Sequence, residues 1–290
     1  MLRIGYAFWR EHDPKVKILV ISYRKRVLVF MDMNRKFFAF DIDGTLLDSN
    51  KQPLESTIEA LELLRNAGHF VTVATGRSRF HAKDIIRSLA FDNYILCNGA
   101  AAFLAHQQVY KNLLDEEQLK AFVAEANELG IDTAFVGMDT AKRASSLNIG
   151  IMDEAMRSFG AQLPELDMHF PEEKEVYQAL AFYGKEYEDY FDDRYSKLRF
   201  VRWHENSVDV VPKDGSKAAT ILSVAHQLGI SQKDVICFGD GQNDREMLQA
   251  AGVGVAMGNA APEIQAIADK VTASNDEDGI WQALKELDLI

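Results

Sequence analysis

The sequence predicts an α/β fold in which a doubly wound, Rossmann-like parallel sheet carries an inserted α+β cap domain. Short apolar runs alternate with helical patterns over residues 33–113 and again over 208–290, the order found in parallel sheets covered by helices. Several of these runs end in acidic, small polar or glycine residues, at the strand ends where open parallel sheets bind ligands. Residues 114–207 break the alternation and carry 20 acidic against 10 basic residues, so we expect them to form the cap.

The first part of the core, residues 33–113, begins with Phe37–Phe40, four consecutive apolar residues typical of a strand buried on both faces. A helical stripe of apolar residues follows from Leu54 to Ala67, and Gly68 is placed to end that helix. The remaining expected elements are a strand, a helix, a second strand and a hairpin: Phe70–Ala74, Phe80–Leu89, Tyr94–Cys97, and Ala101–Phe103 with Gln108–Tyr110. This β-α-β-α-β order is the start of a doubly wound sheet.

The middle and last parts of the chain differ in pattern. In the cap we expect a helix over Asp115–Leu129, helical stretches near 151–159 and 186–193, and strands at Thr133–Met138, Ala144–Ile149, Tyr177–Gly184 and Lys197–Trp203. Strands and helices that do not strictly alternate are typical of antiparallel α+β domains. From 208 the alternation returns, with helices from Lys217 to Leu228, up to Ala251, over Pro262–Ala268 and over Gly279–Leu287, and strands at Val235–Phe238, Val253–Met257 and Lys270–Thr272.

Residues 1–32 form an N-terminal extension unlike the rest, with seven Lys or Arg against three Asp or Glu. Its two apolar runs, 18–21 and 27–30, are too short for a secretory signal, and no cleavage site of small residues follows them. Two interpretations remain: a β-hairpin added to a sheet edge, or a stretch that precedes a natural start at Met33. We favour the second, because the first core strand begins almost immediately after Met33.

Composition argues against several classes of function. The 47% hydrophobic and 26% charged residues are those of an ordinary globular protein, and no apolar stretch reaches the ~18 residues that span a bilayer. A net charge of −12 disfavours nucleic acid and anionic membranes as partners. Cys97 and Cys237 both lie in apolar runs, which indicates buried, reduced thiols and a cytoplasmic location. The sequence carries no signal for an oligomeric state.

Residues that carry chemistry lie at the ends of the expected strands and at the start of one helix. In chain order they are Asp41, Asp43, Thr75, Lys217, Asp240, Asn243 and Asp244. A doubly wound sheet brings them to one edge, where crowded carboxylates repel one another unless a cation lies among them. Oxygen ligands without His or Cys favour Mg²⁺. The hydroxyl, ammonium, amide and main-chain N–H groups are donors for an anion, so the sequence predicts a magnesium-dependent phosphate site.

These motifs resemble those of the haloacid dehalogenase-like superfamily, in its phosphatase branch. D-x-D-G-T occupies residues 41–45, a threonine stands at 75, a lysine at 217, and G-D-x-x-N-D at 239–244. With an insert between the second and third motifs, T-G-R at 75–77 and N-G at 98–99, the chain is similar to the Cof-type phosphatases. The resemblance covers residues 36–290, and four motifs in order at strand ends are far more specific than any one of them.

The resemblance implies catalytic and metal-binding roles. Asp41 would be the nucleophile that forms an aspartyl-phosphate, and Asp43 the acid and base that serves the leaving group and then water. Asp41, the carbonyl of Asp43 and Asp240 would hold Mg²⁺, with Asp244 beside them as a further ligand or support. Lys217 would offset the charge of the nucleophile and the phosphate during catalysis.

The resemblance also implies a set of phosphate and substrate contacts. These are Ile42, Gly44, Thr75, Gly76, Arg77, Asn98, Lys217 and Asn243. Arg77 either reaches the substrate or caps its own helix, and Asn98 either faces the site or serves as an ordinary turn residue.

The sequence therefore predicts a phosphatase that hydrolyses small phosphomonoesters such as sugar phosphates, nucleotides or cofactor phosphates. A phosphomutase would use the same core and return the phosphate to the substrate, and a non-catalytic regulatory protein would keep the fold without turnover. The partner would be a small phosphorylated metabolite. The sequence does not identify this metabolite, because specificity would lie in cap side chains that follow no recognisable pattern.

Overall fold

The computed structural model describes residues 16–19, 29–32 and 35–290. Within the first two ranges, β1 (Val16–Leu19) and β2 (Val29–Asp32) pair antiparallel as a two-stranded sheet of their own. Among the described strands they pair only with each other, so this pair does not extend the edge of either larger sheet. The interpretation that the natural start is Met33 falls on residues outside the described ranges.

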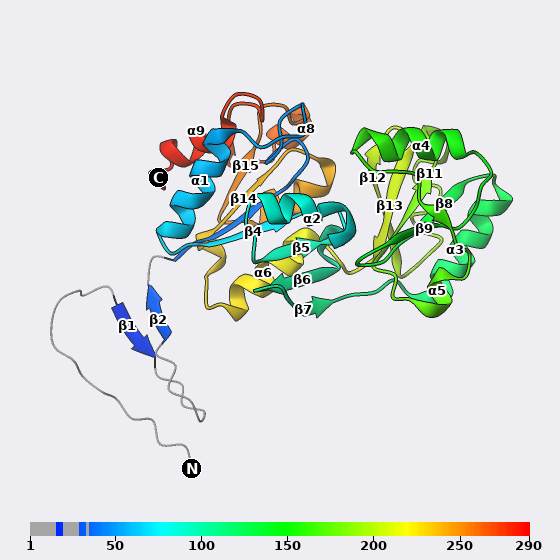
Figure 1. Cartoon of the computed structure of the whole chain (residues 1–290), viewed down its shortest axis with the longest axis horizontal. Coiled ribbons are helices and arrows are strands. Elements are labelled where there is room, and N and C mark those ends of the chain that lie inside the picture. Colours follow the sequence, from blue (N-terminus) through cyan, green and yellow to red (C-terminus); the bar gives the residue numbers. More distant parts are fainter. Residues whose placement is uncertain (1–15, 20–28, 33–34) are drawn as a thin grey trace, which may run out of the picture.

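An eight-stranded sheet forms the core, in the order β16-β15-β14-β3-β4-β5-β6-β7 (Figure 1). Its strands are β3 (Phe37–Phe40), β4 (Phe70–Ala74), β5 (Tyr94–Leu96), β6 (Ala101–Leu104), β7 (Gln107–Lys111), β14 (Val235–Gly239), β15 (Val253–Ala256) and β16 (Lys270–Val271). The six strands from β16 to β5 are parallel, and the hairpin β6–β7 adds two antiparallel strands. β3 lies between β4 and β14, so the expected doubly wound α/β core is confirmed.

Helices cover both faces of this sheet. One face carries α1 (Glu55–Asn66), α2 (Arg79–Ser88) and α9 (Gly279–Glu286), and the other carries α6 (Lys217–Gln227), α7 (Arg245–Ala250) and α8 (Pro262–Gln265). Phe38 and Phe40 pack into the first apolar cluster, while Phe37 and Ala39 pack into the second. Side chains alternate across a strand, so a strand buried on both faces must be apolar at every position.

A six-stranded sheet forms the cap, in the order β10-β9-β8-β11-β13-β12. Its strands are β8 (Asp132–Val136), β9 (Ala141–Arg143), β10 (Glu165–Leu166), β11 (Gln178–Phe182), β12 (Leu198–His204) and β13 (Ser207–Pro212). All neighbours are antiparallel except β9 and β10. The apolar side chains of α3 (Glu116–Glu128) and α5 (Phe170–Glu173) pack with one face, and those of α4 (Ile149–Ser158) with the other.

Two predictions inside the cap are wrong. Residues 144–148 form no strand, because the Asp132 carboxylate accepts hydrogen bonds from the Ser145 hydroxyl (2.5 Å) and the Asn148 N–H (2.5 Å), which fold this segment into a loop around it. The expected helix near 186–193 is only a short 3₁₀ turn at Lys185–Tyr187 followed by turns, and Asp189 there has a left-handed φ of 60°.

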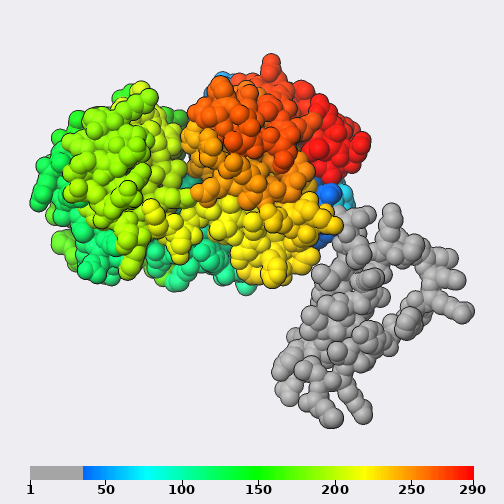
Figure 2. Space-filling view, turned by 180° about the vertical axis from the view of Figure 1, so that it is seen from behind, coloured from blue at the N-terminus to red at the C-terminus, as the bar shows by residue number. Residues whose placement is uncertain are grey.

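The core and the cap lie side by side and are joined by two chain segments (Figures 1 and 2). The outgoing segment follows β7 and the returning one follows β13, and they touch through Asn112 Nδ2 and Asp214 Oδ1 at 2.9 Å. β13 begins at the cap boundary expected at 207 and runs beyond it, yet it pairs with β11 and β12 in the cap sheet. The division of the chain at 114 and 207 stays a prediction. Within the described ranges, no helix combines the length and apolar character that crossing a membrane requires.

Candidate active site

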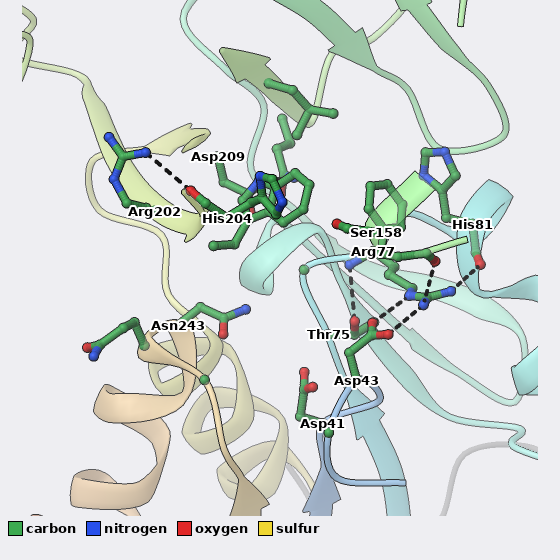
Figure 3. A pocket seen from close by; sticks show the side chains of 18 of the residues that line it. Asp41, Asp43, Thr75, Arg77, His81, Ser158, Arg202, His204, Asp209 and Asn243 are labelled. Atoms are coloured by element: carbon green, nitrogen blue, oxygen red, sulfur yellow. Dashed lines mark hydrogen bonds and ion pairs between the residues drawn. The ribbon is translucent and has the colours of Figure 1, made fainter. Parts of the chain in front are cut away.

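Two aspartates follow β3 and line one cavity between core and cap (Figure 3). Asp41 is buried, and its N–H donates to a main-chain carbonyl of β14 (3.0 Å), which fixes its position. Gly44 has a φ of +76°, and a Cβ there would lie 2.2 Å from Asp240 Oδ2, so only glycine lets this turn approach Asp240. The Ile42 side chain is buried in the core, so only its main chain can face a bound anion.

Lys217 lies beneath the cavity as the first residue of α6. The Ser216 hydroxyl accepts a hydrogen bond from the Ala219 N–H (3.1 Å) and starts this helix. Lys217 is 2% exposed, and its Nζ lies 2.6 Å from Asp41 Oδ1 and 2.7 Å from Asp244 Oδ1. Burial alone would lower the pKa of Lys217, but the two carboxylates outweigh it and the pKa is raised. Lys217 is therefore a fixed cation between two aspartates.

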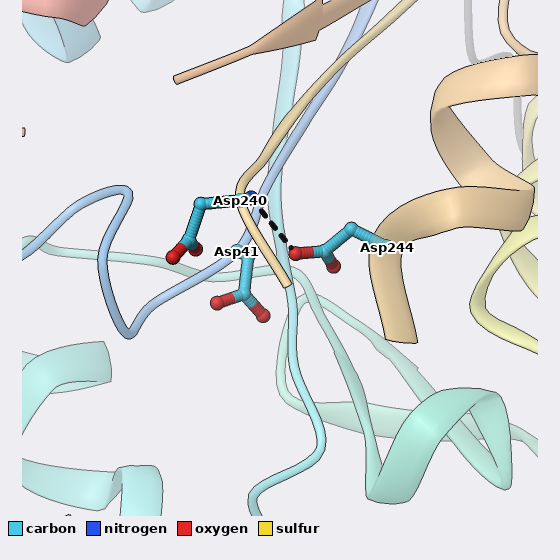
Figure 4. A group of neighbouring side chains, drawn as sticks. All are labelled: Asp41, Asp240 and Asp244. Carbon is cyan, nitrogen blue, oxygen red and sulfur yellow. Dashed lines mark hydrogen bonds between the residues drawn. The ribbon is translucent and has the colours of Figure 1, made fainter. Parts of the chain in front are cut away.

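Three carboxylates form a tight acidic group (Figure 4). Asp41, Asp240 and Asp244 each offer an oxygen, and these oxygens lie within 4.8 Å of one another. Burial, together with the charge of Asp244, raises the pKa of Asp240 to about 7. Burial likewise raises the pKa of Asp41 well above its usual range, although Lys217 opposes this. Carboxylates this close repel one another when they are ionised, and a bound divalent cation relieves that repulsion.

The donor set of this group fits Mg²⁺ because its ligand atoms are all oxygens. Asp244 is already held: Oδ1 contacts Lys217, and Oδ2 accepts the N–H groups of Asp240 (3.1 Å) and Gly241 (2.9 Å). Asp240 faces the cavity and accepts two hydrogen bonds, from the Thr45 hydroxyl at Oδ1 (3.2 Å) and from Asn259 Nδ2 at Oδ2 (3.2 Å), against three at Asp244. Asp41 and Asp240 are thus the carboxylates with more oxygen capacity left for a metal.

The Asp43 carboxylate is held by cations rather than by the acidic group. Arg77 grips it at two points, with Nε and Nη2 each 2.7 Å from a carboxylate oxygen, and Lys51 Nζ lies 3.3 Å away. Burial alone would raise the pKa of Asp43, but the contact with Arg77 outweighs it and lowers the pKa. Arg77 also donates to the carbonyls of His81 (3.2 Å) and Phe159 (3.1 Å), so it connects Asp43 to the end of α4 in the cap.

The segment after β4 brings a hydroxyl to the same cavity. Thr75 is buried, and its Oγ1 accepts the Arg77 N–H (3.1 Å), which leaves the hydroxyl proton free to donate. Gly76 follows, and a Cβ there would lie 3.1 Å from Asn98 Oδ1 and 3.3 Å from Asp209 Oδ2. The glycine lets this backbone pack closely against buried polar side chains.

Asn98 belongs to a buried polar network between core and cap. Its Nδ2 donates to Asp209 Oδ2 (2.6 Å) and to Gln178 Oε1 (3.0 Å), and its Oδ1 accepts from Asn243 Nδ2 (3.0 Å). Gln178 Nε2 also donates to Asp209 Oδ1 (2.8 Å). Burial raises the pKa of Asp209 to about 7, although the hydrogen bond from Asn98 opposes this.

The cavity has a volume of about 610 Å³. Of the predicted residues, those that line it are Asp41, Asp43, Gly44, Thr75, Gly76, Arg77, Asp240 and Asn243. Ile42, Asn98, Lys217 and Asp244 are buried behind this surface. On the cap side the cavity is walled by side chains that sequence reasoning missed, among them Phe159, Gln178, Trp203 and Asp209.

The only sequence signal for this missed group was Asp209, a lone acidic residue within the apolar run from Val208 to Val211. Each Lys or Arg among the described residues that line the cavity is already paired. Lys51 and Arg77 contact Asp43, and Arg202 contacts Glu188 (2.6 Å). The cavity therefore offers polar donors and acidic groups but little unused positive charge away from the phosphate site.

Comparison with known proteins gives a consistent result. A family model described as haloacid dehalogenase-like hydrolase matches residues 38–284. YkrA of Bacillus subtilis (strain 168) is 40% identical over 258 residues, covering 89% of this chain and 100% of YkrA. The pyridoxal phosphate phosphatase YbhA of Escherichia coli (strain K12) is 30% identical, covering 86% and 97% of the two chains. A solved structure of the HAD subclass IIB sugar phosphatase BT4131 superposes with a TM-score of 0.79 at 32% identity, covering 88% and 100%.

Proposed function

The chain belongs to the haloacid dehalogenase-like hydrolase family and is a phosphatase, and we propose that it hydrolyses small phosphomonoesters with Mg²⁺ through an aspartyl-phosphate. The observation that carries this proposal is the buried Lys217 ammonium, which bridges Asp41 and Asp244 beneath a cavity lined by Asp240 and Thr75. A nucleophilic carboxylate, a fixed cation and a set of oxygen ligands are the parts that phosphoryl transfer requires.

In the first step Asp41 attacks phosphorus. Asp41 Oδ1 is held by Lys217, which leaves Oδ2 to form the new bond while the bond from phosphorus to the ester oxygen breaks. Thr75 and Asn243 donate to phosphate oxygens as charge develops on them. Mg²⁺, held by Asp41 and Asp240 with the Asp43 carbonyl, would supply positive charge for the phosphate.

Asp43 moves the proton in both steps. It donates a proton to the leaving oxygen, then takes one from the water that hydrolyses the aspartyl-phosphate, which restores Asp41 and releases inorganic phosphate. Because Arg77 keeps Asp43 ionised, the first step requires Asp43 to be released from Arg77. Arg77 is also bonded to the Phe159 carbonyl in the cap, so we expect movement of the cap to accompany that release.

We propose that the substrate carries one phosphate on a neutral or cationic group. The cavity is rich in acidic residues and each of its cations contacts a carboxylate, so a second anionic group would have to displace a carboxylate to gain a partner there. Relatives named for pyridoxal phosphate and for sugar phosphate hydrolysis agree with a small metabolite. The buried free thiols Cys97 and Cys237 fit a reducing compartment, and we propose the cytoplasm.

An aryl phosphate assay with trapping of the phosphoenzyme tests this function. Wild-type protein with Mg²⁺ should release phosphate and form an acid-stable, hydroxylamine-sensitive phosphoenzyme, while Asp41→Asn should do neither. Asp92→Asn is a matched control, because Asp92 is an exposed core residue that does not line the cavity and contacts the exposed His106. Turnover by Asp41→Asn would refute the mechanism, and interconversion of phosphate isomers without net release would indicate a mutase.

A further inference from the structure

Building on the proposed function, we infer that Asp209 is a positioning residue through which the cap orients Asn98 and thereby the phosphate-binding amide of Asn243. Asp209 lies in β13 of the cap, and Asn243 lies in the turn between β14 and α7 of the core. Figure 3 shows them on the cap side and the core side of the same cavity. Asn98 connects them through hydrogen bonds of 2.6 Å and 3.0 Å.

The direction of this chain of hydrogen bonds is set by Asp209. An ionised carboxylate only accepts hydrogen bonds, so both amides that face Asp209 must turn their NH₂ groups toward it. The carbonyl oxygen of Asn98 then faces Asn243, so Asn243 must donate a hydrogen bond to it through Nδ2. The Asn243 oxygen lies near Gly241, 2.6 Å from where a Cβ of that residue would stand. The second N–H of Asn243 is thereby kept as a donor for a phosphate oxygen.

Burial makes this orientation strict. Asp209, Asn98 and Gln178 are 5%, 3% and 3% exposed, so water cannot readily replace a mismatched partner. Gln178 and Asp209 come from the neighbouring cap strands β11 and β13, and Asn98 comes from the core. The arrangement therefore exists only while the cap is packed on the core. The network also packs against Gly76, beside the Thr75 hydroxyl, which places it next to the phosphate site.

Asp209→Asn tests the inference because it changes one oxygen to NH₂ with almost no change in shape. If the new NH₂ faces Asn98, two donors meet directly. If it faces Gln178, that amide must turn, and its own NH₂ then meets the NH₂ of Asn98. Either arrangement favours reversal of Asn98, which would present a donor to Asn243 in place of an acceptor.

The measurement is the dissociation constant of inorganic phosphate with Mg²⁺ present, by calorimetry and by competitive inhibition of aryl phosphate hydrolysis at pH 8. Asn243→Ala should weaken phosphate binding about 10- to 100-fold, the worth of a hydrogen bond to a charged group. Asp209→Asn should weaken it about 10-fold or more by the same reasoning, and adding it to Asn243→Ala should weaken binding no further. Gln178→Met is the matched control: it removes a contact across the same junction but leaves the hydrogen bond from Asn98 to Asp209, so binding should change by less than about 3-fold.

Three results would overturn the inference while leaving the proposed function intact: wild-type phosphate affinity in Asp209→Asn, full additivity with Asn243→Ala, or an equal loss in Gln178→Met. Wild-type affinity in Asn243→Ala itself would remove the phosphate role of that amide, and the inference with it. If Asp209→Asn fails to fold, Asn98→Gly interrupts the same chain inside the core. Asn98 has a φ of 53°, which glycine adopts readily, and this variant should show the same loss and the same lack of additivity.

Discussion

Replacing Lys217 by Met should destabilise the metal-free protein strongly. The ammonium is 2% exposed and lies within 2.7 Å of both Asp41 and Asp244, so its removal leaves two buried carboxylates without a counter-charge. Removing one partner of a buried ion pair costs about 3–5 kcal/mol, a large share of a total stability of about 5–15 kcal/mol. The assay is urea unfolding in EDTA at 25 °C, and Lys120→Met, which breaks an exposed pair with Glu116 on α3, should leave the midpoint unchanged.

The penalty in Lys217→Met should depend on pH. Lys217 has a raised pKa in the folded state, so its stabilising contribution in the wild type is fully present below the unfolded Lys pKa of about 10.4 and spans the whole assay range. In the variant, burial and the charge of Asp244 hold the pKa of Asp41 above its unfolded value, without the opposing effect of Lys217. The folded state then binds a proton that the unfolded state does not, so stability falls as pH rises above about 4.

The loss should therefore be larger at pH 8 than at pH 4. Mg²⁺ should restore part of it at pH 8, because a cation bound by Asp41 and Asp240 partly replaces the missing charge. A loss below about 1 kcal/mol in EDTA, or equal losses at pH 4 and pH 8, would refute this account of the buried charges.

Metal removal, the Asp43 carboxyl and the charge of the substrate give three further tests. EDTA should abolish phosphate release and Mg²⁺ should restore it. Asp240→Asn should raise the Mg²⁺ concentration for half activity more than Asp244→Asn does, since Asp244 already accepts three hydrogen bonds. The reverse order would mean that the ligands are misassigned. Asp43→Asn should keep Mg²⁺ and substrate binding but lower kcat by ~10²–10⁴-fold, most for esters with poor leaving groups. With an aryl phosphate, this variant should accumulate phosphoenzyme after a burst of product. Equal losses with aryl and unactivated esters, and no burst, would remove Asp43 from the acid–base role. Neutral or cationic monophosphates should exceed bisphosphates in kcat/KM, because cavity cations such as Arg77 are already paired; a clear preference for polyanions would contradict this.

The sequence by itself determined the core of this protein, because the information that specifies it is local. A strand buried on both faces must be apolar at each position, so Phe37–Phe40 was predicted with the bounds that β3 has. The hairpin β6–β7 and the helices α1, α3 and α6 were predicted to within one or two residues, because apolar spacing and turn residues mark them. Parallel strands end at one edge, so the sequence also predicted which side chains would gather there, while their catalytic roles stay predictions.

Only the tertiary structure decided what each of these side chains contacts. The two partners of Lys217 are 176 and 27 residues away, and the Arg77 contact with Phe159 spans 82 residues. In the cap, Asp132 folds a distant segment into a loop where local propensity had predicted a strand. In the local sequence Asp209 is one acidic residue in an apolar strand. It gains Asn98 as a partner only because β13 is packed against the turn that carries Asn98, 111 residues earlier. Long-range packing selects among arrangements that local sequence leaves equal in energy, which is why the cap side of the site could not be predicted.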